Sequence, residues 1–285
     1  MENANFVLQI RASYNQLTKA EKKVADYVLA HQSEVMYMSI TDLADACKVG
    51  DTSVYRFCRT MKLQGYQEFK MRLSLSQGAT TGLSLENSMS GGCDDRLGTM
   101  AEKVMQNHLN AIKETYMLLN RDAFEKTIMM FEKAARVCFF GVGDSLLIAE
   151  AARNRFLRVT GKVECVADPH MQAMEASLTT PEDLIVMVSY SGATKDNIYV
   201  AKVAKQAGAK IVCITHFQKS PLTVYADAIL LCGSSEGPLE GGSMTAKLSQ
   251  LYLIDLLYQE YYERNYKESK INNEKTSRAV VEKLF

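Results

Sequence analysis

The chain lacks any excess of charge and has few prolines. Its 285 residues include 33 Lys and Arg and 33 Asp and Glu, so no overall field draws it toward nucleic acid or a membrane, although a local basic face remains allowed. No uncharged apolar run approaches the ~20 residues of a membrane-spanning helix. The first residues also lack the charged-then-apolar pattern of a signal peptide. We therefore expect a soluble, cytoplasmic protein.

Cysteine is present, but in a pattern that argues against cross-links. The seven cysteines are odd in number and show no Cys-x-x-Cys spacing, which disfavours a disulfide framework or a zinc site. We predict no metal and no cofactor. Hydrophobic residues make up 47% and charged residues 23%, as in ordinary globular proteins. The length suggests about two domains.

A stretch rich in Gly, Ser and Thr interrupts the periodic pattern and predicts a flexible linker. The prolines all lie after it, which permits helices in the first half without proving them. The predicted organisation is a helical domain at 1–77, a linker at 78–98, a second domain with leading helices at 99–264 and a charged tail at 265–285.

Two short helices with the same apolar spacing follow an amphipathic helix near 17–28. The first contains Ile40, Leu43, Ala44 and Cys47, and the second repeats these intervals from Val54 to Met61. Between them Gly50 is able to take a left-handed conformation, and Ser39 and Asp51 or Thr52 are suitable N-caps. The pattern predicts a helix-turn-helix.

The outward face of the second helix carries polar and basic side chains. Arginine grips guanine or phosphate, and residues at the start of such a helix reach base edges. We therefore predict that this face binds DNA through Thr52, Ser53, Tyr55, Arg56 and Arg59. The alternative from pattern alone is a generic helical bundle whose arginines are merely solvated.

From residue 136 short apolar runs alternate with helical patterns. This alternation predicts a parallel sheet covered on both faces, with the carboxyl ends of its strands opening on one ligand crevice. The five predicted strands are 137–140, 163–167, 184–188, 211–215 and 228–232.

Two strand-to-helix junctions carry residues that suit an anion. The first is Gly141–Ser145, whose small residues, including Gly143 and Asp144, let a ligand approach the helix start. The second is Ser189–Thr194, where three hydroxyls and Gly192 suit a phosphate monoester. The alternative is that these hydroxyls only cap helices.

Isomerisation of a sugar phosphate would need a general base, commonly Glu or His. His170 and His216 follow predicted strands and are able to reach the crevice, but each is expected to be a polar loop residue rather than a catalyst. Glu236 and Glu240 lie in a Gly-rich segment, where a carboxylate would accept sugar hydroxyls. We predict no catalytic residue.

The residues resemble the RpiR/MurR-type bacterial transcriptional regulators, which join a helix-turn-helix domain to a sugar isomerase (SIS) domain. The resemblance covers about 1–77 and 125–262. Its motifs include Leu17–Val28, Ser39–Ala44, Thr52–Phe57, Gly65–Lys70, Gly141–Ser145, Ser189–Thr194, Gly208–Val212 and Ser220–Leu222.

The resemblance implies a DNA-binding regulator of carbohydrate metabolism, a dimer or tetramer, that binds a phosphorylated sugar. Its phosphate contacts correspond to Ser145, Ser189, Ser191 and Thr194, and Gly143, Asp144, Gly192 and Glu240 complete the expected effector site. Enzymes with this domain that isomerise glucosamine phosphate use a Glu on the last long helix. Gln250 stands there, which favours binding without turnover.

Two rival functions stay open from the sequence. One is a sugar-phosphate isomerase with an accessory helical domain, and the other is a sugar-phosphate-binding module that does not contact DNA. Neither rival requires the arginine face of the second helix.

Overall fold

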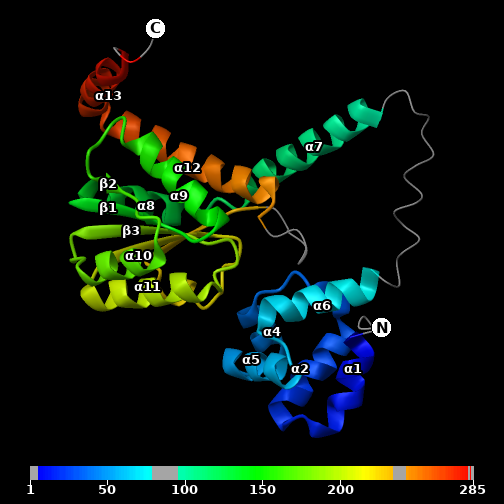
Figure 1. Cartoon of the computed structure of the whole chain (residues 1–285). Coiled ribbons are helices and arrows are strands. Elements are labelled where there is room, and N and C mark those ends of the chain that lie inside the picture. Colours follow the sequence, from blue (N-terminus) through cyan, green and yellow to red (C-terminus); the bar gives the residue numbers. More distant parts are fainter. Residues whose placement is uncertain (1–5, 79–95, 234–241, 282, 284–285) are drawn as a thin grey trace. The chain divides into compact units, whose positions relative to one another are not determined.

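A computed structural model of the chain describes residues 6–78, 96–233, 242–281 and 283. They fall into two units: the first comprises the described residues up to Asn107 together with 242–243, and the second begins at His108 and contains the rest. The long helix α7 (Arg96–Met117) runs across this boundary. The other helices of the first unit are α1 (Phe6–Ser13), α2 (Lys19–Ala30), α3 (Gln32–Val35), α4 (Ile40–Cys47), α5 (Asp51–Thr60) and α6 (Tyr66–Gly78), with a 3₁₀ turn at Tyr14–Gln16 (Figure 1).

The first unit is an all-helical domain built around the apolar positions that its periodicity predicts. Helix α2 starts at a capping box in which Thr18 and Glu21 satisfy each other's backbone amides. Phe57 of α5 and Phe69 of α6 are completely buried, with ring centroids 5.8 Å apart and planes at 74°. This edge-to-face contact fixes α5 against α6 and leaves the other side of α5 outside the core.

The second unit contains the predicted five-stranded sheet and its covering helices. Its elements after α7 are α8 (Arg121–Lys133), β1 (Arg136–Phe140), α9 (Asp144–Phe156), β2 (Val163–Glu164), α10 (Pro169–Ser177), β3 (Asp183–Val188), α11 (Lys195–Ala207), β4 (Lys210–Thr215), a 3₁₀ turn (Thr223–Tyr225), β5 (Ala228–Leu231), α12 (Met244–Arg264) and α13 (Tyr266–Val281).

The sheet is parallel throughout, in the order β2-β1-β3-β4-β5. The predicted fold class, a helical helix-turn-helix domain followed by a parallel α/β domain, is confirmed. Strand β2 is shorter than predicted and ends at Glu164, because only two of its residues pair with β1. No helix within the described ranges is long and apolar enough to cross a membrane.

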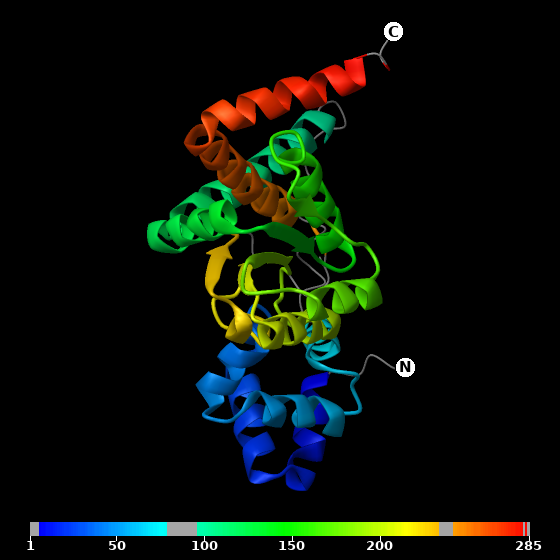
Figure 2. The same ribbon diagram turned by 90° about the vertical axis from the view of Figure 1, so that its left-hand side faces the viewer.

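Side chains of each strand alternate between two apolar clusters, one on each face of the sheet. Val137 and Phe139 of β1 pack with helices α8, α9 and α12, whereas Cys138 and Phe140 pack with α10 and α11. The helices lie accordingly on opposite sides of the sheet (Figure 1, Figure 2). Since both faces are covered, the strands are apolar on both sides, as expected for a parallel sheet, and charged residues stand only at strand ends, namely Arg136, Glu164, Asp183 and Lys210.

The predicted charged tail is largely helix α13, which is held by polar contacts. The side-chain amide of Asn272 donates to the Val159 carbonyl (2.9 Å), and the Thr276 hydroxyl donates to the Arg158 carbonyl (3.0 Å). These bonds give hydrogen-bond donors to two backbone carbonyls of the loop between α9 and β2. Most of the predicted linker, together with Glu236 and Glu240, lies outside the described residues.

Candidate functional site

The helix pair α4–α5 has two well-defined ends and a short connection. Ser39 caps α4 through a capping box with Asp42. The left-handed residue between the helices is Lys48 (φ 54°) rather than Gly50, which has φ −85° and is itself the N-cap of α5. The prediction that Asp51 or Thr52 is the cap was therefore wrong by one or two residues. Asp51 instead accepts a hydrogen bond from the Thr41 hydroxyl (2.9 Å), which joins the two helices.

The predicted DNA-binding side chains occupy the surface of α5. Val54, Phe57 and Cys58 bury the inner face of the helix. Ser53 is half-buried at its start, and the remaining four predicted contacts are exposed, namely Thr52, Tyr55, Arg56 and Arg59. The helix thus presents its predicted polar face to solvent.

Each arginine has a polar neighbour. Nη1 of Arg59 donates to the Leu63 carbonyl (3.3 Å). Arg56 lies close enough to Glu21 to influence its pKa: burial alone would raise the pKa of Glu21, but hydrogen bonds from Thr18 and Thr60 and the charge of Arg56 lower it overall. The Thr60 hydroxyl donates to Glu21 (2.7 Å) and ties α5 to α2. The carboxyl end of α5 is therefore tied to α2, and its outward face stays exposed.

A second candidate site lies at the carboxyl edge of the sheet. The chain leaves β1 toward α9 on one face and leaves β3 toward α11 on the other. Neighbouring parallel strands whose connections diverge in this way create a crevice, the usual ligand position in open α/β sheets. The two predicted anion loops, Gly141–Ser145 and Ser189–Thr194, follow these two neighbouring strands and are therefore expected to border that position.

The loop after β1 is tight and ends beside a cation. A Cβ added at Gly141 would lie 2.7 Å from the Ser145 carbonyl oxygen, so glycine is required by this close approach. Gly143 (φ 61°) is the N-cap of α9. The Lys247 ammonium of α12 lies 3.2 Å from the Asp144 carboxylate. The sequence did not point to Lys247, because no spacing relates α12 to a loop so far away along the chain.

The loop after β3 has hydroxyls that do not all serve as caps. Thr194 is the N-cap residue of α11 but makes no side-chain capping bond. The Ser191 hydroxyl accepts a hydrogen bond from the Ala193 amide (3.2 Å), and Gly192 adopts φ 59°. Ser189 is only 2% exposed, so it lies beneath the loop surface. The alternative that these residues merely cap the helix does not account for Thr194.

The loops after β3 and β4 are fastened to each other. The His216 amide (3.0 Å) and the Thr215 hydroxyl (3.0 Å) both donate to the Tyr190 carbonyl. The rings of Tyr190 and His216 stack with centroids 5.0 Å apart. Nδ1 of His216 lies 3.0 Å from the Cys232 carbonyl and therefore donates to it. His216 is thus part of a packed aromatic group, whereas His170 is exposed.

One cluster has metal-ligand atoms but already contains an arginine. Cys138, Glu164 and Glu175 offer atoms within 4.8 Å of one another. Nη1 of Arg136 lies 3.6 Å from Glu164 and 3.7 Å from Glu175, and its Nη2 lies 3.4 Å from Asp183. A guanidinium among three carboxylates supplies the positive charge that a metal ion would bring, so we interpret the cluster as structural.

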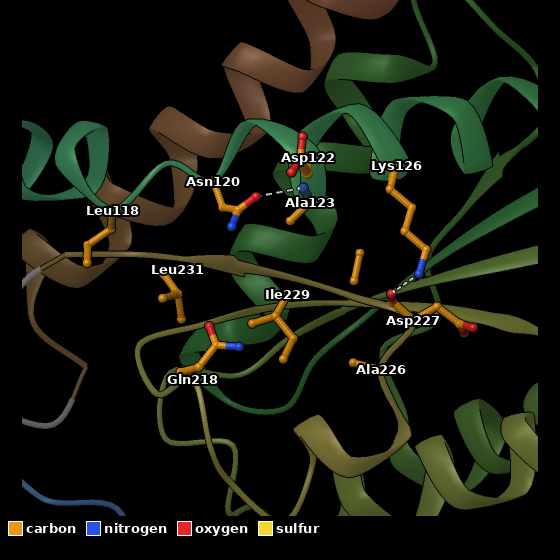
Figure 3. Close-up of a pocket in the computed structure, with 11 residues that line it drawn as sticks. Leu118, Asn120, Asp122, Ala123, Lys126, Gln218, Ala226, Asp227, Ile229 and Leu231 are labelled. Atoms are coloured by element: carbon orange, nitrogen blue, oxygen red, sulfur yellow. Dashed lines mark hydrogen bonds between the residues drawn. The ribbon is translucent and has the colours of Figure 1, made fainter.

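A pocket of about 380 Å³ opens beside α8 and the edge strand β5 (Figure 3). Asp122 and Asp227 line it, together with Lys126, which donates to the Asp227 carbonyl (2.6 Å). None of the predicted effector residues lines this pocket. The pocket is therefore separate from the two predicted anion loops.

Comparison with known proteins finds a matching family model for each unit. Residues 4–79 match the family model described as "Helix-turn-helix domain, rpiR family", and residues 130–259 match the SIS domain. The chain is 35% identical over 260 residues, 90% of each chain, to an "Uncharacterized HTH-type transcriptional regulator" of Haemophilus influenzae. It is 32% identical over 258 residues to the HTH-type transcriptional regulator HexR of Pseudomonas aeruginosa, covering 89% of this chain and 87% of HexR.

A similar solved structure extends over both units. The Vibrio vulnificus NanR protein complexed with ManNAc-6P matches with a TM-score of 0.86 and 27% identity, covering 99% of this chain and 100% of that one. Together with the two family models, this agreement includes the helix pair α4–α5 and the parallel sheet. The chain therefore belongs to the RpiR family of helix-turn-helix transcriptional regulators that carry a SIS domain.

Proposed function

We propose that this regulator binds a phosphorylated sugar in the crevice between β1 and β3, that the bound sugar changes the affinity of α5 for operator DNA, and that the genes controlled serve carbohydrate metabolism. The observation that carries the proposal is the convergence of two small-residue loops at the point where the sheet's connections diverge. NanR supports it, because that protein is seen with a phosphorylated amino sugar.

The phosphate is assigned to the loop after β3. The Thr194 hydroxyl makes no capping bond, and the first amides of the 13-residue helix α11 carry positive partial charge. The half-buried Ser191 adds a second hydroxyl. Ser189 and, on the opposite loop, Ser145 keep their predicted phosphate contacts. Gly143 and Asp144, with Lys247 beside Asp144, are assigned to the sugar. Glu240 keeps its predicted role, outside the described residues.

We assign the site to binding without turnover. A general base has to remove a carbon-bound proton, and Gln250, 3% exposed on α12, bears an amide that has no basicity at neutral pH. His216 already donates Nδ1–H to a carbonyl and packs against Tyr190. The purified protein should therefore leave sugar phosphates unchanged. Interconversion of aldose and ketose phosphates at a steady rate would favour the isomerase instead.

The DNA contact is assigned to α5 in a homo-oligomer. Two copies would place two α5 helices on two half-sites, so the oligomer would set the spacing of the operator. Helix α7 supports self-association, because it exposes large apolar side chains that include Leu97, Met100, Val104 and Met105. Contiguous exposed apolar surface of this kind marks interaction sites.

The effector assignment is tested by calorimetry with ManNAc-6P, glucosamine 6-phosphate, glucose 6-phosphate and fructose 6-phosphate. A hydrogen bond to a charged group contributes about 1.5–3 kcal/mol. Ser191→Ala and Thr194→Val should therefore each lower the affinity for the tightest-binding sugar phosphate about ten- to a hundredfold. Ser177→Ala is the matched control, because its hydroxyl donates to Met174 (2.6 Å) on α10, away from both loops. Unchanged affinity in both loop variants would remove these hydroxyls from the site.

The DNA assignment is tested with the regulator's own upstream region in fluorescence anisotropy at several salt concentrations. Arg56→Ala and Arg59→Ala should each weaken binding by about 1–3 kcal/mol if they contact bases, or reduce the salt slope by about 1 if they contact phosphate. Arg11→Ala, on α1, is the control. Retention of full sequence-specific affinity by the double variant would contradict the assignment of α5.

A further inference from the structure

One completely buried side chain connects the segments that follow the carboxyl ends of β1 and β2. Gln172 of α10 is 0% exposed, and its Nε2 donates to the carbonyl oxygens of Gly141 (2.9 Å) and Val166 (2.7 Å). Gly141 is the first residue after β1, and Val166 lies two residues beyond β2. No sequence motif pointed to this residue, because it lies within an ordinary amphipathic helix.

The orientation of this amide is fixed by its partners. Rotating the amide by 180° would bring Oε1 against two carbonyl oxygens, so only the observed orientation satisfies both. In that orientation Oε1 is buried and has no hydrogen-bond partner. An unsatisfied buried acceptor is unfavourable and calls for an explanation. An apolar side chain would fill the same space without this penalty, which suggests that the two donated bonds are what glutamine contributes.

Holding the Gly141 carbonyl also sets the direction of the next amide. The peptide unit is planar and trans, so the Val142 N–H points opposite to the Gly141 C=O. Because that carbonyl points toward Gln172, the Val142 amide points away from α10. Gly141 has little freedom to compensate, since it lies against the first turn of α9. Gln172 therefore controls how the loop leaves β1 before it reaches Gly143, Asp144 and Ser145.

We propose that Gln172 is a positioning residue for the effector site: its two hydrogen bonds preorganise the loop Gly141–Ser145 to receive the sugar part of a phosphorylated sugar. The identity of the ligand rests on the function proposed above, but the positioning of the loop does not. Without these bonds the loop samples other peptide orientations, and effector binding then has to select the competent one.

The test uses Gln172→Met, which keeps the length of the side chain and removes the donor, and Gln172→Asn, which keeps the amide but is too short to reach both carbonyls. Thr179→Val is the matched control. It deletes a buried hydrogen bond from the Thr179 hydroxyl to the Ala176 carbonyl (2.7 Å), at the other end of α10. Hydrogen exchange of the effector-free full-length chain is followed by mass spectrometry, together with calorimetric affinity for the tightest sugar phosphate of the panel.

Both Gln172 variants should increase amide exchange over residues 142–146 about tenfold and lower the affinity for the sugar phosphate by a similar factor. Thr179→Val should lower stability without either effect. Exchange at 142–146 that is equal in wild type and in a folded Gln172 variant would overturn the proposal, as would equal loosening by Thr179→Val. If the wild type binds no sugar phosphate, the proposed function fails, and the exchange data still decide the role of Gln172.

Discussion

Replacing Glu175 with glutamine should stabilise the second unit at pH 8 and leave its stability unchanged near pH 4.5. The Glu175 side chain is only 12% exposed; its Oε1 accepts a bond from the Cys138 thiol (3.4 Å), while its Oε2 is buried and unpartnered. Burial raises the pKa of Glu175 most, and the adjacent Glu164 raises it further, against the smaller opposing effects of Cys138 and Arg136. The pKa of this carboxyl is about 7.

The magnitude follows from the difference between the folded and unfolded states. The pKa of Glu175 rises from 4.5 to about 7, and each pKa unit corresponds to 1.36 kcal/mol, so the ionised form is disfavoured by about 3 kcal/mol. Between these two values the folded state holds more protons than the unfolded state, and stability therefore falls as the pH rises through this window. Above pH 7 the full penalty applies. Glutamine resembles the protonated carboxyl and does not ionise.

The assay is urea unfolding of wild type and Glu175→Gln at pH 4.5, 6, 7 and 8, followed by circular dichroism. The stability difference should grow with pH to about 3 kcal/mol at pH 8. Glu182→Gln, an exposed glutamate near the start of β3, should show no comparable trend. A difference that is constant across this range, or a variant that is less stable than wild type at pH 8, would refute the reasoning.

Three other substitutions test the packing around the sites. Gly192→Ala should destabilise the loop after β3, because Gly192 has φ 59° and an added Cβ would collide with the Ser220 side chain. The expected result is a lower melting temperature in thermal unfolding. Phe156→Ala should cost about 3–5 kcal/mol in urea unfolding, since this fully buried ring contacts Phe131, Phe139, Tyr258 and Tyr261, and a smaller loss would show that the cavity collapses. Thr60→Val should cost about 1–3 kcal/mol by leaving Glu21 short of a donor, and a wild-type melting temperature would exclude this.

Much of the fold was predictable because its signals are local. The capping box Thr18–Glu21 and the repeated apolar spacing of α4 and α5 each reside within a few residues, and both predicted elements are present. The buried strands are continuous apolar runs between turn residues, which predicted a sheet covered on both faces. Strand β2 was overestimated, because hydrophobicity at Cys165 and Val166 does not reveal whether a neighbouring strand extends alongside them.

The parts that sequence reasoning missed depend on contacts between distant segments or on unusual backbone. Lys48 takes the left-handed conformation at the end of α4 that was expected of Gly50. Nothing in the local pattern shows this, since glycine is the usual residue there. Lys247 and Gln172 approach the loop after β1 from α12 and α10. Their positions follow only from the order of the strands and the faces on which the helices lie.

The walls of the crevice belong to elements on opposite faces of the sheet, and this bears on how an effector would act. Asp144 and its partner Lys247 come from α9 and α12, whereas Thr194 begins α11 on the other face. A ligand that contacts both walls binds best when they are at the right separation. It thereby favours one arrangement of the helices. A difference of about 1–3 kcal/mol between the binding free energies of the two arrangements is enough for allosteric control. A ligand confined to one wall would bind without such a preference, which is why a phosphate joined to a sugar suits this crevice better than inorganic phosphate alone.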